Sequence, residues 1–177
     1  NNIKDTVIVK EEGKLPITFT AKISPMRTRV VDNAFEVGDK VGLYATISDY
    51  SLTENRYIEN LSLSYNSENS LTPIRDIFYP EGKYNLDIYA YYPYANQADG
   101  PKQVGYSVKE DQSTSEYYYK SDFLRAYAES VKKTSKPVEL TFNHLMSKVL
   151  LTITPDDTFE EDEFEVDKCK GCCKACD

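Results

Sequence analysis

The segment that most constrains the fold is NLDIYAYYPYANQ, residues 85–97. Its side chains alternate between two faces, which is the pattern of a β-strand with one face on a core. The second face is largely aromatic, so we expect it to be partly covered as well. One face consists of Leu86, Ile88, Ala90 and Tyr92, and the other of Asp87, Tyr89 and Tyr91. The Tyr92–Pro93 bond is a candidate cis bond, although trans is the commoner state.

Similar alternation elsewhere predicts an all-β fold. Clear strands are expected at residues 16–23, 41–47, 138–142 and 148–154, and weaker or shorter ones at 57–65, 73–79, 103–108 and 122–128. Turn-forming residues separate these segments, and long runs of helix-forming residues are missing. Short strands at this spacing favour a β-sandwich or barrel over an alternation of strands and helices.

Length and charge restrict the partners. The chain has 177 residues, enough for one domain with a sizeable core, and a formal net charge of −8. A phosphate backbone is bound by a basic surface, so the charge argues against nucleic acid and equally against an anionic membrane surface. No apolar run approaches the roughly 18 residues that would span a bilayer.

The composition changes after Pro155, which predicts a domain over residues 1–155 and a separate tail over 156–177. The tail begins with a strongly acidic run that buries too little apolar surface to offset its ordering entropy, so we expect it to be flexible. All four cysteines follow, at Cys169, Cys172, Cys173 and Cys176. Three interpretations stay open for them: an end that is not native, disulfides within or between chains, or a metal site.

The residue types needed for catalysis are scarce. His144 is the single histidine, and no phosphate-binding glycine loop or metalloprotease, hydrolase or EF-hand motif is present. We interpret His144 as a packed, hydrogen-bonded histidine in a turn. The sequence therefore predicts a protein that is not an enzyme and has no cofactor and no metal site in its domain.

Two groups of residues are candidates for binding or processing. Tyr89, Tyr91, Tyr92 and Tyr94, together with residues 117–119, could form a platform on which sugar rings stack, because tyrosine offers a flat apolar face with a hydroxyl. The alternative is that these rings fill the core and rim of a domain without tryptophan. Arg27 and Arg29 lie in a polar linker, where a trypsin-like protease would cut.

Several segments, in this order, resemble the fimbrillin-like proteins, which are subunits of type V pili on Gram-negative anaerobes. They are ITFTAKIS, MRTRVVDNAFEVGDKVGLYA, PIRDIFYPEGKYNLDIYAYYPY, QSTSEYYYKSDFLRAYA and PVELTFNHLMSKVLLTITP, which together cover about residues 15–155. The resemblance implies a transthyretin-like antiparallel β-sandwich of about seven to eight strands, which in the family is usually followed by a second sandwich domain. The chain departs from the family pattern just past Pro155.

The same resemblance implies a function. It is that of a structural, adhesive subunit or accessory tip protein of a fimbrium, exported as a lipoprotein to the outer membrane, with a lipid anchor upstream of Asn1. Cleavage at Arg27 or Arg29 would free the first strand, and another pilus subunit would fill the groove by donor-strand exchange. Host surface proteins or glycans are further expected partners. The alternative is a surface lipoprotein that does not polymerise and binds carbohydrate or protein through its tyrosines.

Overall fold

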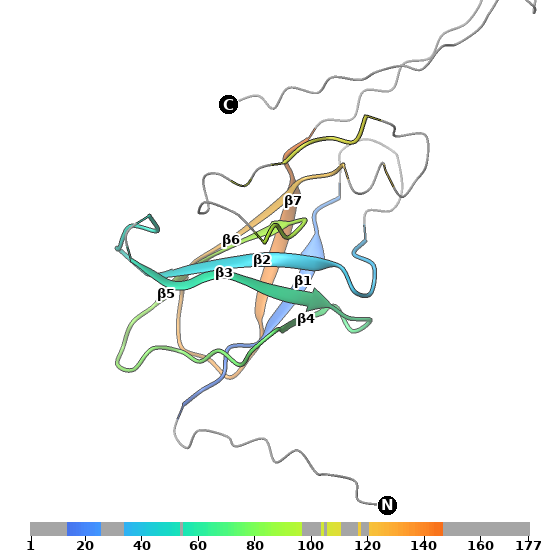
Figure 1. Cartoon of the computed structure of the whole chain (residues 1–177). Coiled ribbons are helices and arrows are strands. Elements are labelled where there is room, and N and C mark those ends of the chain that lie inside the picture. Colours follow the sequence, from blue (N-terminus) through green and yellow to red (C-terminus); the bar gives the residue numbers. More distant parts are fainter. Residues whose placement is uncertain are drawn as a thin grey trace, which may run out of the picture.

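The computed structural model describes residues 14–25, 34–53, 55–96, 104, 106–110, 117 and 121–146. The expected all-β architecture is confirmed in this part of the chain, which holds seven strands (Figure 1). They are β1 (Phe19–Ile23), β2 (Lys40–Ile47), β3 (Arg56–Tyr65), β4 (Ser70–Pro73), β5 (Leu86–Tyr92), β6 (Leu124–Val131) and β7 (Val138–His144).

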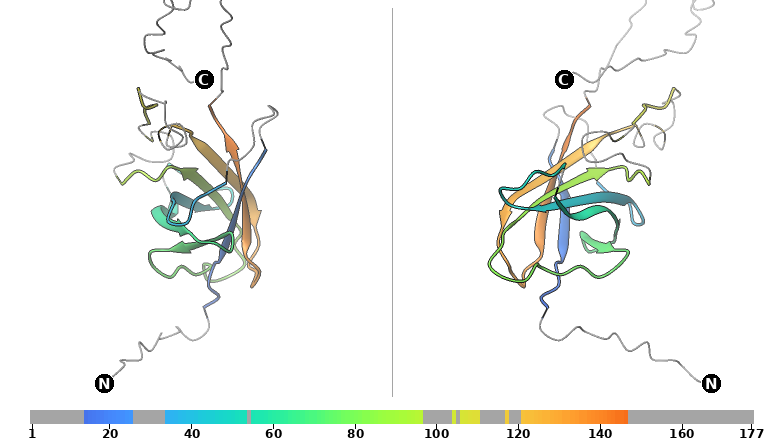
Figure 2. Two further views of the ribbon diagram at one scale, coloured as in Figure 1. Left: turned by 90° about the vertical axis from the view of Figure 1, so that its right-hand side faces the viewer. Right: turned by 60° about the vertical axis from the view of Figure 1, so that its left-hand side comes forward.

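The strands form one sheet that closes on itself as a barrel in the order β1-β4-β3-β2-β5-β6-β7. A barrel is one of the two architectures that the strand spacing favours. Neighbouring strands are antiparallel except at the closure, where β1 runs parallel to β7, with Phe19 opposite Val138 and Ile23 opposite Phe142. Figure 2 shows this pair side by side. A parallel pair needs a long connection, and here the rest of the barrel supplies it.

The alternating residues make a single core inside the barrel. Leu86, Ile88 and Ala90 of β5 are at most 2% exposed, and Tyr92 packs against the same core, as the alternation predicts. The opposite face of β5 is covered as well, since Tyr91 is only 5% exposed. The peptide bond between Tyr92 and Pro93 is cis.

Two predicted strands are not formed. In the segment 73–79 only Pro73 belongs to a strand, the end of β4, and Phe78 makes an isolated bridge with Pro16. Ile17 donates its backbone N–H to Ile77 O, but Pro16 has no N–H with which to continue such a ladder. The described residues between 103 and 108 are not in a strand either.

Two further expectations fall on residues outside the described part. They are the strand at 148–154 and the tail at 156–177 with its four cysteines. The division of the chain after residue 155 therefore remains a proposal.

Candidate functional site

The first strand lies between β4 and β7 in the sheet. Its backbone pairs on one side with β4, where Phe19 is opposite Leu71, and on the other with β7 along its full length. Hydrogen bonds extend this contact at both ends: Val138 N–H donates to Thr18 O, and Ser24 N–H donates to Phe142 O, both at 2.8 Å. The first strand is therefore the segment that closes the barrel.

One face of this segment is apolar and points into the core. Ile17, Phe19 and Ala21 are 2%, 1% and 4% exposed, and Ile23 packs against the core at the far end. The other face is solvated, and Lys22 on it forms an ion pair with Glu139 of β7. This is the alternation that the sequence predicts for residues 16–23. If the segment left, it would open an apolar groove flanked by the unpaired backbone edges of β4 and β7.

The linker that follows lies largely outside the described residues. Arg27 and Arg29, the predicted processing sites, belong to that part, so their role remains a proposal. The last described residues before them, Ser24 and Pro25, follow β1 directly.

The outer face of the sheet carries a row of tyrosines across three strands. The register places Tyr44 of β2 opposite Tyr89 of β5, and Tyr89 opposite Tyr127 of β6. Tyr89 and Tyr127 stack with ring centroids 4.6 Å apart and an interplanar angle of 29°. Exposure rises along the row, from 1% at Tyr44 to 47% at Tyr127. Only the β5 member was a sequence candidate, because cross-strand neighbours are not visible without the register.

A glycine makes room for the next ring on this face. Gly42 of β2 is opposite Tyr91 of β5, and a Cβ atom on Gly42 would overlap the Tyr91 ring. The ring therefore lies across the β2 backbone and reaches β3, where its hydroxyl donates to Asn60 Oδ1 at 2.6 Å. Burial is the main cause that raises the pKa of Tyr91 to about 12.

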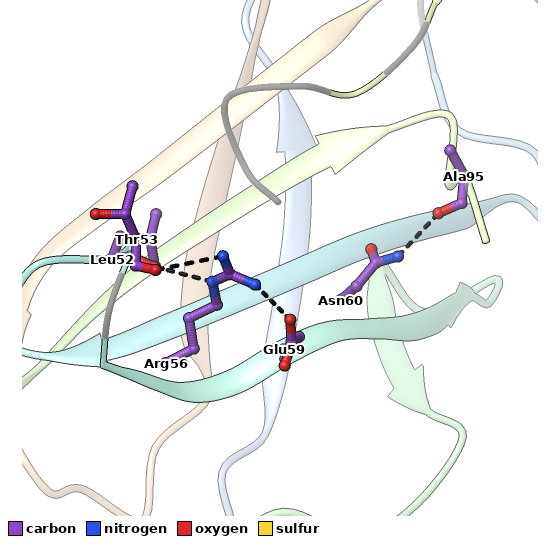
Figure 3. A network of polar contacts seen from close by, with 6 residues as sticks. All are labelled: Leu52, Thr53, Arg56, Glu59, Asn60 and Ala95. Atoms are coloured by element: carbon purple, nitrogen blue, oxygen red, sulfur yellow. Dashed lines mark hydrogen bonds and ion pairs between the residues drawn. The ribbon is translucent and has the colours of Figure 1, made fainter. Parts of the chain in front are cut away.

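Polar contacts on β3 complete the cover of this face (Figure 3). Asn60 donates to Ala95 O at 2.9 Å, which ties β3 to the segment after β5. The Arg56 guanidinium pairs with Glu59 and donates to Leu52 O, and its carbon lies 6.0 Å from the centre of the Tyr44 ring. Tyr44 is thereby enclosed from the outer side.

The four tyrosines that the sequence suggests as ligand-binding residues do not lie together in the structure. Tyr92 turns toward the core, where its ring meets Phe35 at 5.5 Å, and its hydroxyl donates to Asp39. Tyr91 is held on the outer face by its hydrogen bond to Asn60, and Tyr94 lies beyond the end of β5. Of the four, only Tyr89 belongs to the row of tyrosines on the outer face. Its role and that of the other three in binding remain proposals.

His144 is a packed, hydrogen-bonded histidine, as predicted, although it is the last residue of β7 rather than part of a turn. Its Nδ1 lies 2.6 Å from Asp122 Oδ2, and the two side chains are 7% and 18% exposed. Burial raises the pKa of Asp122, against the opposing effect of His144. Ser121 beside this pair uses its hydroxyl to donate to Tyr117 O and to accept from Lys109 N–H. We therefore interpret the pair as a structural contact between the segment before β6 and the end of β7.

The described residues form hollows at the surface, and two of them have a defined lining. One, of about 380 Å³, is lined by Tyr57, Arg75 and residues 76–81, beside the entry of the first strand. The other, of about 350 Å³, lies where β2 ends, β5 begins and β6 ends. Among the described residues no group of three or more His, Cys, Asp or Glu is arranged to hold a metal ion. The same part of the chain has no helix that is long and apolar enough to cross a membrane.

Comparison with known proteins identifies the relatives of this chain. The family model described as fimbrillin-like matches residues 28–175. A protein of Bacteroides ovatus named "Putative fimbrium tip subunit Fim1C" is 27% identical over 86% of the chain, and one of Bacteroides uniformis named "Putative fimbrium subunit Fim1C" is 29% identical over 83%. The chain spans only 28% and 48% of the lengths of these two relatives.

A solved structure supports the fold. The crystal structure of a "putative cell adhesion protein" from Bacteroides uniformis superimposes with a TM-score of 0.58 at 22% identity, over 77% of this chain and 49% of the other.

Proposed function

The chain belongs to the fimbrillin-like family, and from this premise we propose that it is a structural subunit of a fimbrium or an accessory protein of its tip. Its relatives named as fimbrium subunits support this function, and no catalytic role is part of it. The proposal includes a location at the surface of a Gram-negative cell, with a lipid anchor to the outer membrane.

The observation that carries the proposal is the position of the first strand. Together with Ile17 just before it, it contributes three side chains that are at most 4% exposed, yet it lies at the closure of the barrel and is followed by the arginine linker. A cut at Arg27 or Arg29 would leave it held only by non-covalent contacts. A strand from another subunit could then take its place between β4 and β7 by strand addition.

We also infer that the barrel corresponds to the transthyretin-like sandwich implied by the family resemblance. Two seams of the barrel are short and divide it into a layer of β4, β3, β2, β5 and β6 and a layer of β7 and β1. The paired positions at these seams are Phe19 with Leu71, Thr20 with Ser70, Leu124 with His144, and Arg125 with Asn143.

Limited proteolysis tests the processing step. An arginine-specific protease acting on the native chain should cut first after Arg27 or Arg29, with the new N-terminus read by mass spectrometry. Arg56 and Arg125 are protected within strands, and Arg75, exposed after β4, is the internal competitor. The double variant Arg27→Gln/Arg29→Gln should resist the early cut. First cleavage at Arg75 would argue against processing in the linker.

A peptide exchange assay tests the groove itself. A fluorescent peptide with the sequence of residues 15–25 should enter the cleaved chain and co-elute with it in size-exclusion chromatography. The uncut double variant should take up none, and neither should the cleaved chain offered the same peptide with Phe19→Asp. Equal uptake of the two peptides would contradict recognition by the apolar face.

A further inference from the structure

We propose that the hollow at the ends of β2, β5 and β6 binds a neutral sugar residue. Its volume of about 350 Å³ lies within the usual size of small-molecule sites, roughly 300–1,000 Å³. Its lining includes Ser48, Asp49, Lys83, Tyr84, Asp87 and Glu129. None of the lining residues belongs to β1, β4 or β7, so the site does not depend on strand exchange.

The polar groups of the hollow are held in place by one another. Asp87 Oδ1 accepts hydrogen bonds from Ser48 Oγ at 2.8 Å and from Ser130 N–H at 2.7 Å. Asn85 Nδ2 donates to Ser130 Oγ at 2.8 Å. The ends of three strands are thus joined around one carboxylate. A carboxylate fixed in this way can accept hydrogen bonds from sugar hydroxyls with little loss of side-chain entropy on binding.

Backbone strain gathers at the same place. Four described residues other than glycine have a positive φ, and two of them, Asp49 at 75° and Ser130 at 50°, line the hollow. A serine in the left-handed region is uncommon and unfavourable. Ser130 lies next to the shift in register between β5 and β6, where Leu86 is opposite Val131 and Ile88 is opposite Ala128.

Two aromatic rings stand beside these polar groups. Tyr84 lines the hollow and is 52% exposed, and its ring rests against Gly82. Tyr127, 47% exposed, does not line the hollow itself but lies on the neighbouring outer face, where it stacks on Tyr89. Tyr127 lies two residues before Glu129 on β6, and Tyr89 lies two residues after Asp87 on β5, so the alternation puts both rings on the same face as these carboxylates. Local desolvation raises the pKa of Tyr127, followed by its contact with Tyr89 and the negative charges of Asp87 and Glu129. Flat rings beside hydroxyl-binding groups suit the C–H face of a pyranose.

The charge of the hollow selects among sugars. Asp49, Asp87 and Glu129 face a single lysine, Lys83, so carboxylates exceed cations. Sialylated or sulfated sugars would meet like charge and bind more weakly, while neutral hexoses and N-acetylhexosamines would not. The ligand class is therefore a neutral saccharide.

An NMR titration of the full 177-residue chain with neutral hexoses and N-acetylhexosamines tests this site. The expected result is a set of shift changes at Asp49, Tyr84, Asp87 and Glu129. Tyr127→Ala should weaken binding roughly two- to tenfold, the range expected for one aromatic contact. The matched control is Tyr57→Ala, an exposed tyrosine at the other hollow, which should bind as the parent chain does.

A second arm tests the charge argument. Sialylated counterparts of the same sugars should bind more weakly than the neutral ones, and Glu129→Gln should reduce that difference. Absence of shift changes with every neutral sugar would overturn the proposal. So would binding that Tyr57→Ala weakens and Tyr127→Ala does not, or a preference for the sialylated sugars. Because these readouts do not involve the linker, failure here leaves the assembly proposal untouched.

Discussion

The strands β1 and β5 occupy the same barrel but are held in it differently. Both have a strand neighbour on each side. β5 is covered on both faces, by the core on one and by tyrosines from three strands on the other. β1 is covered on one face only, and its other face presents Lys22 to solvent. A strand with one covered face is held by fewer side-chain contacts than a strand with two, and this difference is the physical reason for our proposal that β1, at the closure, is the strand that is exchanged.

The largest expected effect comes from the single cover of β1. Phe19→Ala removes a ring that is 1% exposed and leaves a cavity, so the free energy of unfolding should fall by about 3–5 kcal/mol. Chemical denaturation measures the loss. Tyr50→Ala, at a position 57% exposed, is the matched control and should change stability by less than about 0.5 kcal/mol. A loss near 1 kcal/mol for Phe19→Ala would mean that backbone pairing, not the apolar face, retains β1.

Both strands of this comparison were predictable from alternation, since period-two patterns report on the burial of one face. The segment at residues 73–79 shows the limit of that signal. Ile77 and Tyr79 are buried there, at 5% and 3% exposed, but Ile74 is 79% exposed and no regular ladder forms. Burial without pairing gives the same local pattern as burial in a strand, and Pro16, on the segment opposite Phe78, interrupts the pairing.

For the outer face of β5, the sequence predicted that the face would be partly covered but not which rings would cover it. The excess of tyrosine indicated a second covered face, but not which rings would be covered. That depends on Gly42, whose missing side chain admits Tyr91, and on Tyr127, which meets Tyr89 through the register. For the same reason, the sequence did not predict the parallel pairing of β1 with β7 or the hollow at the strand ends. These features join residues far apart in the sequence, and local periodicity carries no information about them.

Alkaline titration tests the outer cover of β5. The pKa of Tyr91 is about 12 in the folded state, above the ordinary value of 10.0, so between these values the folded chain keeps a proton that the unfolded chain has lost. Stability from this group is complete below pH 10 and falls as pH rises to 12, by about 2–3 kcal/mol.

The measurement is the difference in unfolding free energy between the parent chain and Tyr91→Phe as a function of pH, since other groups that titrate in this range cancel. That difference should be constant below pH 10 and shrink between pH 10 and 12. A difference that does not change with pH would show that the Tyr91 phenol is open to solvent.

A smaller effect is expected where β2 and β5 touch. Gly42→Ala places a methyl group against the Tyr91 ring and should cost about 1–3 kcal/mol through overpacking. In a Tyr91→Ala background the ring is gone, so the same Gly42→Ala change should cost less. The double-mutant cycle measures this coupling. Equal costs in the two backgrounds would place the strain at Gly42 in the backbone rather than against the ring.

The smallest effect is expected on the solvated face of β1. Lys22 Nζ lies 2.5 Å from Glu139 Oε1, but the two side chains are 55% and 59% exposed. Solvent screens such a pair, so Lys22→Ala should cost no more than about 1 kcal/mol, and the cost should shrink at high salt. Denaturation at two ionic strengths measures it, with Glu139→Gln as the partner variant. If Lys22→Ala lowered the free energy of unfolding as much as Phe19→Ala does, and independently of salt, the solvated face would hold β1 as firmly as the apolar face. The distinction from β5 would then disappear, and with it the physical reason for expecting β1 to be exchanged.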